Sequence, residues 1–165
     1  MAQPATFELK LIDLPNLRRL AASEPVDLGN MQVLDGALPP ADVAAHALEQ
    51  LDIGTPAHWC AFFLIVSRNA VLGTCRFRSA PANGRVEIGY AVAESQRGRG
   101  VATEAVKLLL EVAIASGVVT EVFAHIVPEN VASSKVVSRL GFSKRDALVD
   151  HDGKTVAVWS LQTAS

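Results

Sequence analysis

A glycine- and arginine-rich segment, residues 96–102 with the sequence QRGRGVA, is the part of this chain best suited to bind a charged ligand. Glycines allow backbone N–H groups to turn towards a ligand with no Cβ in the way. The amphipathic run that follows predicts a helix, whose N-terminus adds unpaired donors and positive potential. Several converging donors match a pyrophosphate better than a lone carboxylate. The residues expected to hold this group are Arg97, Gly98, Arg99, Gly100, Val101, Ala102 and Thr103.

Three other interpretations compete for the same segment. A Walker loop requires Lys followed by Ser or Thr after its last glycine, and Val101 and Ala102 exclude it. A dinucleotide fingerprint requires a small residue where Thr103 stands and an acid at the end of the next strand, whereas Glu121 comes at that strand's start, so the match is weak. A solvated turn whose arginines serve solubility stays open on these residues alone.

Glu87 is the second chemical candidate, and it lies on the predicted strand 85–92. Because side chains alternate along a strand, Glu87 shares its face with Gly89 and Ala91, which are both very small. Such a face leaves room for a ligand beside a titratable group, as a catalytic cleft requires. The alternative interpretation is a surface glutamate in an ordinary ion pair.

The elements that must position these residues follow from hydrophobic periodicity and from turn and cap signals. A long connection, 23–40, carries three prolines and two glycines, and hairpin turns are expected at 68–69, 83–84 and 152–153. Asp13 and Asn130 are expected to cap helices, and Gly117 and Gly141 to end them. The predicted strands are 6–12, 59–66, 71–77, 85–92, 120–127, 142–148 and 154–161, and the predicted helices are 13–22, 42–51, 103–116 and 130–141. This mixture of hairpins and helical crossovers predicts an α/β (α+β) fold with a mixed, mostly antiparallel central sheet flanked by helices.

Length and composition favour one domain spanning residues 1–165. The net charge of −2 gives no global basic field for nucleic acid or an anionic membrane. Two cysteines suggest no disulfide framework, and the four histidines lack the spacing of a metal site, so we expect no metal. The first ten residues show no signal peptide and no apolar run approaches a membrane span, so a non-exported, cytoplasmic protein is expected.

Three segments together resemble the GNAT family of N-acetyltransferases. Arg97, Gly100 and Ala102 match its motif A, Arg/Gln-x-x-Gly-x-Gly/Ala. Residues 130–133, NVAS, with 140–142, LGF, resemble a second signature, and 87–90, EIGY, a third. The likeness covers residues 86–142, and the N-terminal third is compatible only in the order of its elements. The Asn-x-x-Ser form is similar to the branch that contains ribosomal-protein N-terminal (alanine) acetyltransferases.

The resemblance implies the acyl-CoA N-acyltransferase fold and acetyl-CoA as cosubstrate, with its pyrophosphate on the backbone amides of the glycine-rich segment. It also implies that the Asn130 side chain approaches the pantetheine arm. The expected reaction is direct acetyl transfer, in a ternary complex, to a primary amine, either a protein N-terminal α-amino group or a small molecule. A non-catalytic acyl-CoA-binding or sensor domain is the alternative. A homodimer is left open.

Thioester aminolysis requires an uncharged amine, whereas a primary amine is protonated at pH 7. Glu87, directly or through water, is the predicted base, and a backbone N–H near Ala91 or Val92 is predicted to polarise the thioester oxygen. The departing thiolate then needs a proton. Many members of the family supply a tyrosine where this chain has Val137, so Ser133 is the donor that the resembling branch offers, with bound water as the alternative.

Overall fold

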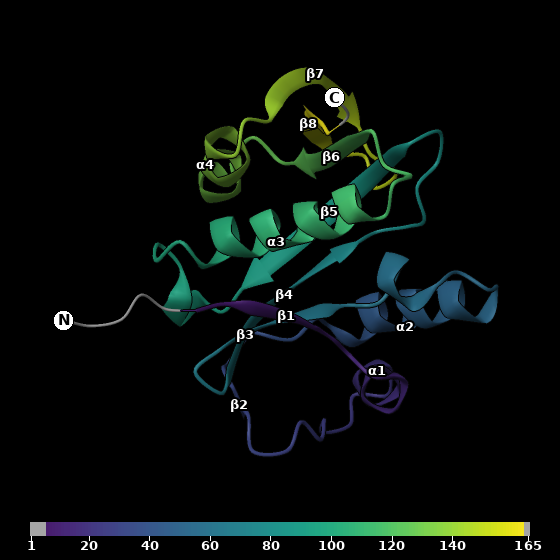
Figure 1. The fold of residues 1–165 in the computed structure, drawn as a ribbon, viewed down its shortest axis with the longest axis vertical. Helices are drawn as coiled ribbons and strands as arrows, with labels where there is room; N and C mark the ends of the chain where they lie inside the picture. The colour runs from purple at the N-terminus through teal and green to yellow at the C-terminus, as the bar shows by residue number, and fades with distance from the viewer. Residues whose placement is uncertain (1–5, 164–165) are drawn as a thin grey trace.

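The computed structural model describes residues 6–163, which form one twisted sheet with helices on both faces (Figure 1). None of the helices within these residues combines the length and apolar character that crossing a bilayer requires. The strands are β1 Glu8–Leu11, β2 Gln32–Val33, β3 Phe63–Ser67, β4 Ala70–Phe77, β5 Arg85–Val92, β6 Glu121–Ile126, β7 Ser143–Val149 and β8 Thr155–Gln162. The α-helices are α1 Leu14–Ala21, α2 Ala41–Asp52, α3 Val101–Ala115 and α4 Val131–Arg139, with short 3-10 turns at Ala57–Trp59 and Glu94–Gln96.

The eight-stranded sheet has the order β1-β3-β4-β5-β6-β8-β7, with β2 paired to β4. Neighbouring strands are antiparallel except in the pairs β5–β6 and β2–β4. A parallel pair needs a crossover connection, and α3 supplies it between β5 and β6. The predicted mixed, mostly antiparallel sheet flanked by helices is confirmed.

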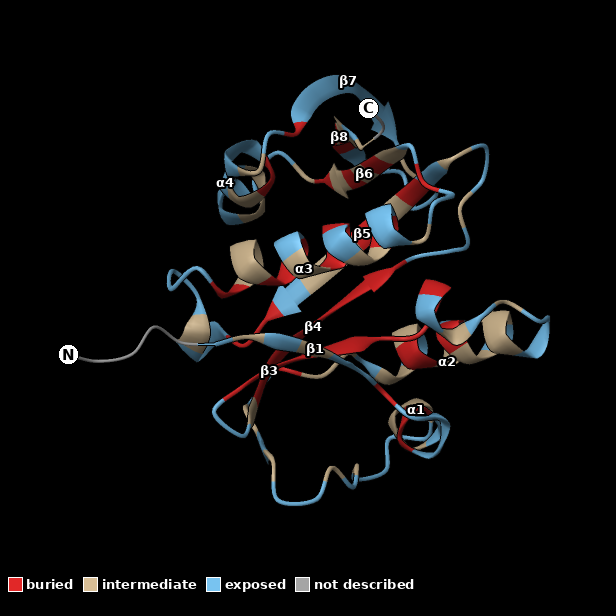
Figure 2. Ribbon diagram, viewed as in Figure 1, coloured by how far each residue is buried: buried red, intermediate tan, exposed pale blue. Residues whose placement is uncertain are grey.

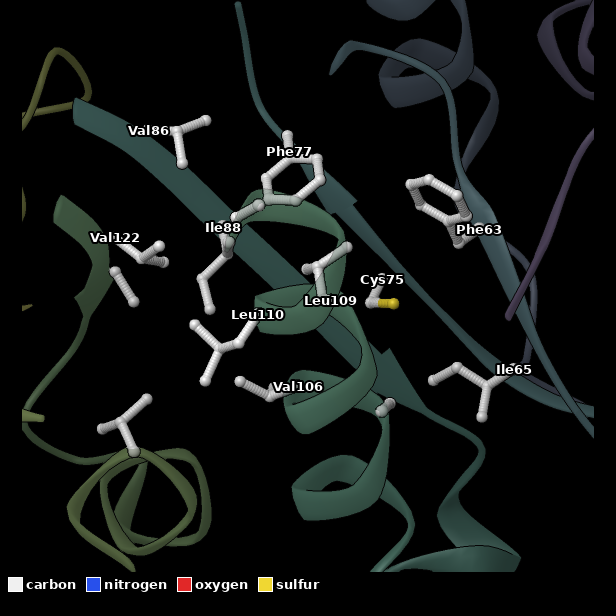
Figure 3. Packing of buried hydrophobic residues seen from close by; sticks show 14 of the residues in the cluster. Phe63, Ile65, Cys75, Phe77, Val86, Ile88, Val106, Leu109, Leu110 and Val122 are labelled. Atoms are coloured by element: carbon white, nitrogen blue, oxygen red, sulfur yellow. The ribbon is translucent and has the colours of Figure 1, made fainter. Parts of the chain in front are cut away.

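Two hydrophobic cores lie on opposite faces of the sheet, and β3 shows how the sequence separates them. Phe63 and Ile65 join the cluster against α3, whereas Leu64 and Val66 join the cluster with α1 and α2. Figure 2 shows β3 and almost all of β4 buried between these layers. Figure 3 shows Ile65, Ile88 and Leu109 among the side chains that pack between the sheet and α3, and Val101 at the start of the helix belongs to the same core.

Strands β5 and β6 separate soon after they begin. Their pairing is recorded only from Arg85–Glu121 to Glu87–Phe123, although β5 continues to Val92. Beyond that point β5 keeps β4 as its partner on one side. Figure 1 shows the two strands close together at one end and apart at the other. The edge of residues 88–92 that turns away from β4 is therefore left to other groups.

The structure corrects the predicted elements in three places. The apolar run from Trp59 reflects burial rather than one long strand, because a 3-10 turn at residues 57–59 precedes β3. The long connection includes β2, two residues that run parallel to β4. Helix α3 begins at Val101 instead of Thr103, since the left-handed Gly100 directly precedes it.

The approach of β4 to the end of β5 depends on Gly73. A Cβ there would overlap the Ala91 carbonyl oxygen and lie 2.9 Å from Val92 Cα. We expect Gly73→Ala to lower the free energy of unfolding by roughly 1–3 kcal/mol, the usual cost of overpacking. Gly89→Ala is the matched control, because its Cβ would meet only the flexible end of the Arg78 side chain, at 3.1 Å. Urea denaturation measures both variants, and equal losses would contradict the close approach.

Candidate active site

A cleft of about 770 Å³ lies between the end of β5, the start of α3 and the first turns of α4. Its wall contains most of the residues predicted from sequence to bind the cosubstrate, and Ser133 as well. Arg99 is exposed and is not part of this wall. The described residues that line the cleft are Tyr90, Ala91, Val92, Gln96, Arg97, Gly98, Gly100, Val101, Ala102, Thr103, Asn130, Ala132, Ser133, Lys135, Val136 and Arg139.

The start of α3 gives the cleft its anion-binding character. Gly98 and Gly100 have φ of +76° and +79°, a conformation that side chains with a Cβ rarely adopt. Gly100 precedes the helix and offers no side chain to cap it. In the first turn of α3, Glu104 is the first residue whose amide makes a helical hydrogen bond, to Gly100 O at 3.1 Å. Within residues 6–163 the amides of residues 101–103 have no hydrogen-bond acceptor, so they can meet a negatively charged ligand.

Arg97 ties this turn to the end of β5. Its Nε donates to the Val92 carbonyl oxygen at 3.2 Å, and the Ala93 amide donates to Leu72 O of β4 at 2.8 Å. The sequence predicts Arg97 as one of the residues that hold the pyrophosphate. The structure adds a mechanical role, because the side chain fixes the glycine-rich turn against the strand that carries the predicted amide donors.

The hydrogen-bond pattern of β5 distinguishes between Ala91 and Val92. Two hydrogen bonds join this segment to β4: Arg78 N–H donates to Glu87 O, and Ala93 N–H donates to Leu72 O. The odd-numbered residues of β5 are therefore the ones whose backbone groups bond to β4. Because backbone groups alternate along an antiparallel ladder, the N–H of Ala91 turns to β4 and that of Val92 turns to the opened edge. Val92 is therefore the residue whose amide faces the space between β5 and β6.

Helix α4 closes the other side of the cleft. Asn130 Oδ1 accepts the Ser133 amide at 3.1 Å, which confirms the predicted cap. The Tyr90 hydroxyl, from β5, donates to the Ser133 carbonyl oxygen at 3.0 Å. Burial raises the pKa of Tyr90, and the Ser133 side chain beside the phenol offsets part of that rise. One strand and one helix that are distant in the sequence are thus joined inside the cleft.

Some lining residues were not assigned to the site from sequence. Tyr90 shares a strand face with Val86, Ile88 and Val92, which indicated only a core position. On α4, residues 132, 135, 136 and 139 follow the spacing of one helix face, and this signal could have identified them from the position of Asn130. Two cations, Lys135 and Arg139, enter the cleft through that face.

Glu87 is not among the residues that line the cleft, and it lies on the face of β5 opposite to Tyr90 and Val92. Its Oε2 is 3.3 Å from Arg78 Nε and 3.5 Å from His125 Nδ1, and 22% of its side chain is exposed. The space expected beside it is filled, because the Arg78 guanidinium occupies the place next to Gly89 that a side chain there would need. The predicted open space beside Glu87 on this face of β5 is therefore wrong. Sequence reasoning missed Arg78, which has no motif of its own.

A buried arginine stands next to this cluster. Arg76 is 6% exposed, and its guanidinium donates to the carbonyl oxygens of Phe77 and Arg78 at 3.4 Å each. It also lies 4.9 Å from the centre of the Phe62 ring. Burial and the neighbouring Arg78 lower the pKa of Arg76 to about 10. Glu87 therefore has positive charges on β4 and a histidine on β6 as neighbours, and a base at this position must compete with those ion pairs.

Comparison with known proteins gives a family match and a partial relative. A family model described as an acetyltransferase (GNAT) domain matches residues 13–143. The uncharacterized N-acetyltransferase p20 of Bacillus licheniformis is 37% identical over 93 residues, which cover 55% of this chain and 52% of that protein. The chain thus spans about half the length of that curated relative.

Solved structures share the arrangement of elements over almost the whole chain. The RimL ribosomal L7/L12 α-N-protein acetyltransferase superposes with a TM-score of 0.67 at 20% identity, covering 95% of this chain and 93% of that one. The aminoglycoside acetyltransferase AAC(6')-Ib, in complex with coenzyme A, gives a TM-score of 0.69 at 15% identity, with coverages of 96% and 95%. At these identities the likeness shows a common fold.

Proposed function

This chain belongs to the GNAT acetyltransferase family, and from that premise we propose that it transfers the acetyl group of acetyl-CoA to a primary amine. The observation that carries the proposal is the start of α3, where two left-handed glycines leave the first amides of the helix facing the cleft. The N-terminus of a helix is a natural site for phosphate. A pyrophosphate at this point places the rest of the cosubstrate along the cleft.

The cleft fits coenzyme A in size and in the chemistry of its wall. Its volume of about 770 Å³ lies within the range of roughly 300–1,000 Å³ typical of ligand sites. Arg97, Lys135 and Arg139 provide cations near the proposed polyphosphate. Ala91, Val92 and Val136 provide a less polar surface for the proposed path of the pantetheine arm, beside Asn130. We assign these residues to acetyl-CoA binding, and Arg99 only to the local positive field.

The proposed reaction is a direct attack of the amine on the thioester in a ternary complex. The Val92 amide is the proposed donor to the thioester oxygen, because it turns to the opened edge of β5, and Ala91 lends that segment its small side chain. Glu87 is the proposed base, through a water that reaches the amine from the other face of the strand. Ser133, in the first turn of α4, is the predicted proton donor to the thiolate.

The acceptor is proposed only as a primary amine. One structural neighbour is named for a protein α-amino group and another for aminoglycosides, and their TM-scores are almost equal. A screen of acetyl-CoA consumption against peptides with varied N-termini, polyamines and aminoglycosides tests the proposal. Acetylation of one class of amine supports it. Tight acetyl-CoA binding with no acetylation of any amine would favour the non-catalytic acyl-CoA-binding domain instead.

Acetyl-CoA is expected to raise the melting temperature, since a ligand that binds only the folded state stabilises it by about 2.7 kcal/mol at one hundred times its Kd. ADP, which carries a pyrophosphate but no pantetheine arm, should give a smaller shift, and NAD none comparable. Differential scanning fluorimetry with the three ligands at equal concentration makes the comparison. Equal stabilisation by NAD would reopen the dinucleotide interpretation.

Gly100→Val is expected to weaken acetyl-CoA binding at least tenfold, because the added side chain stands where backbone amides meet the pyrophosphate. Gly117→Val is the matched control at the other end of α3. Both glycines have positive φ, +79° and +74°, and neither has a neighbouring atom within 4 Å of an added Cβ. The backbone strain is therefore similar. Calorimetric titration of both variants separates the effects, and equal affinities would remove the glycine-rich turn from the site.

Glu87→Gln is expected to lower kcat by about 10²- to 10⁴-fold, the usual loss for a general base, with little change in acetyl-CoA affinity. The acidic limb of the pH profile should change with it. Glu121→Gln is the control, because Glu121 also pairs with an arginine on β5, Arg85, at 2.6 Å. The hydrogen bond from Arg85 holds the pKa of Glu121 low, so this variant should lose stability above that pKa while keeping kcat. Full activity of Glu87→Gln at neutral pH would make Glu87 structural.

A further inference from the structure

We propose that Tyr90 is the catalytic residue that protonates the departing CoA thiolate. The backbone carbonyl of Ser133 positions Tyr90 by accepting a hydrogen bond from its hydroxyl. This inference rests on the proposed acetyl transfer and names a residue for one of its steps. Tyr90 takes the role of proton donor to the thiolate, which the sequence analysis assigned to the Ser133 side chain.

The position of Tyr90 carries the first part of the argument. It lies on the portion of β5 that has separated from β6, one residue from Ala91 and two from Val92. Its side chain lines the cleft together with Asn130 and Ser133 of α4. The hydroxyl is fixed by its 3.0 Å bond to Ser133 O. A phenol is thus held at the place where the thioester is proposed to lie.

The other candidates are less suited to give up a proton. Val137 occupies the place where a tyrosine was expected, and its side chain is fully buried in the core. The Ser133 side chain lies beside the Tyr90 phenol, but it is an aliphatic alcohol. An ordinary thiol has a pKa of about 8.5 and a phenol of about 10, so a tyrosine can protonate a thiolate at modest cost. An aliphatic hydroxyl is a far weaker acid.

The step balances with the groups already named. Glu87 takes one proton from the ammonium form of the acceptor, and the free amine nitrogen then forms a bond with the acetyl carbon. The carbon–sulfur bond breaks, the Tyr90 O–H turns from Ser133 O to the sulfur, and the sulfur takes its proton to give CoA as a thiol. The nitrogen releases a second proton to water, Glu87 also returns its proton to water, and the Tyr90 phenolate takes one proton back from water. One proton is released overall for each ammonium acetylated.

The surroundings of Tyr90 suit this cycle. Burial raises its pKa, so the phenol is protonated at neutral pH and loses its proton only as the solution becomes alkaline. The ionisable groups that share its cleft are Arg97 from the loop and Lys135 and Arg139 from α4, all cationic. Its partner on β4 is the buried thiol of Cys75.

The chain contains a single tyrosine, which makes a direct test practical. Growth on 3-fluorotyrosine in place of tyrosine changes residue 90 alone and lowers the pKa of its phenol, which absorbance of the phenolate measures in the same sample. The assay uses acetyl-CoA with a peptide carrying a free N-terminus or with an aminoglycoside, whichever the wild type acetylates. We expect the alkaline limb of the kcat profile to move to lower pH by the same amount as the phenol pKa.

Tyr90→Phe keeps the ring and removes the proton, and we expect kcat to fall about 10²- to 10⁴-fold while the Kd for acetyl-CoA changes less than threefold. Ser133→Ala, which keeps the carbonyl, should lower kcat less than tenfold. An unmoved alkaline limb with fluorotyrosine, or a Tyr90→Phe variant with full kcat, overturns the role of Tyr90 while wild-type acetylation stands. A wild type that binds acetyl-CoA and acetylates no amine overturns the proposed function itself.

Discussion

The parting of β5 from β6 is the constraint on which the rest of the site depends. The two strands are parallel and pair only from Arg85–Glu121 to Glu87–Phe123. A longer ladder would consume the backbone groups of residues 88–92 and close the sheet. Because the ladder stops, the Val92 amide and the Tyr90 side chain are available to a ligand. Helices α3 and α4 contact each other and share one hydrophobic core with β5 and β6.

The crossover that a parallel pair requires also supplies the anion site. Helix α3 must start near the end of β5, so its N-terminus and the preceding left-handed glycines meet the opened edge of the strand. Arg97 holds the glycine-rich turn against the end of β5 by donating a hydrogen bond to Val92 O. Tyr90 holds α4 against β5 by donating a hydrogen bond to Ser133 O. The binding turn, the strand and the second helix are thus fixed relative to one another by two hydrogen bonds from β5 and its loop.

Local signals in the sequence predict most of this architecture. Strand β5 and the Asn130 cap were predicted from alternation and cap chemistry, because both depend on neighbours within a few residues. The glycine-rich turn was found for the same reason. The bond of Tyr90 to Ser133 joins residues 43 positions apart, and no local pattern encodes it. The cover that Arg78 gives Glu87 was missed because it depends on the register between β4 and β5.

The central claim is that acetyl-CoA binds across the start of α3 and the start of α4. Hydrogen–deuterium exchange with and without saturating acetyl-CoA tests it directly, because bound amides exchange more slowly. The account predicts slower exchange in peptides covering residues 97–103 and 130–136, with β7, an exposed edge strand, unchanged as an internal reference. Slower exchange confined to other segments, with residues 97–103 unaffected, would contradict it.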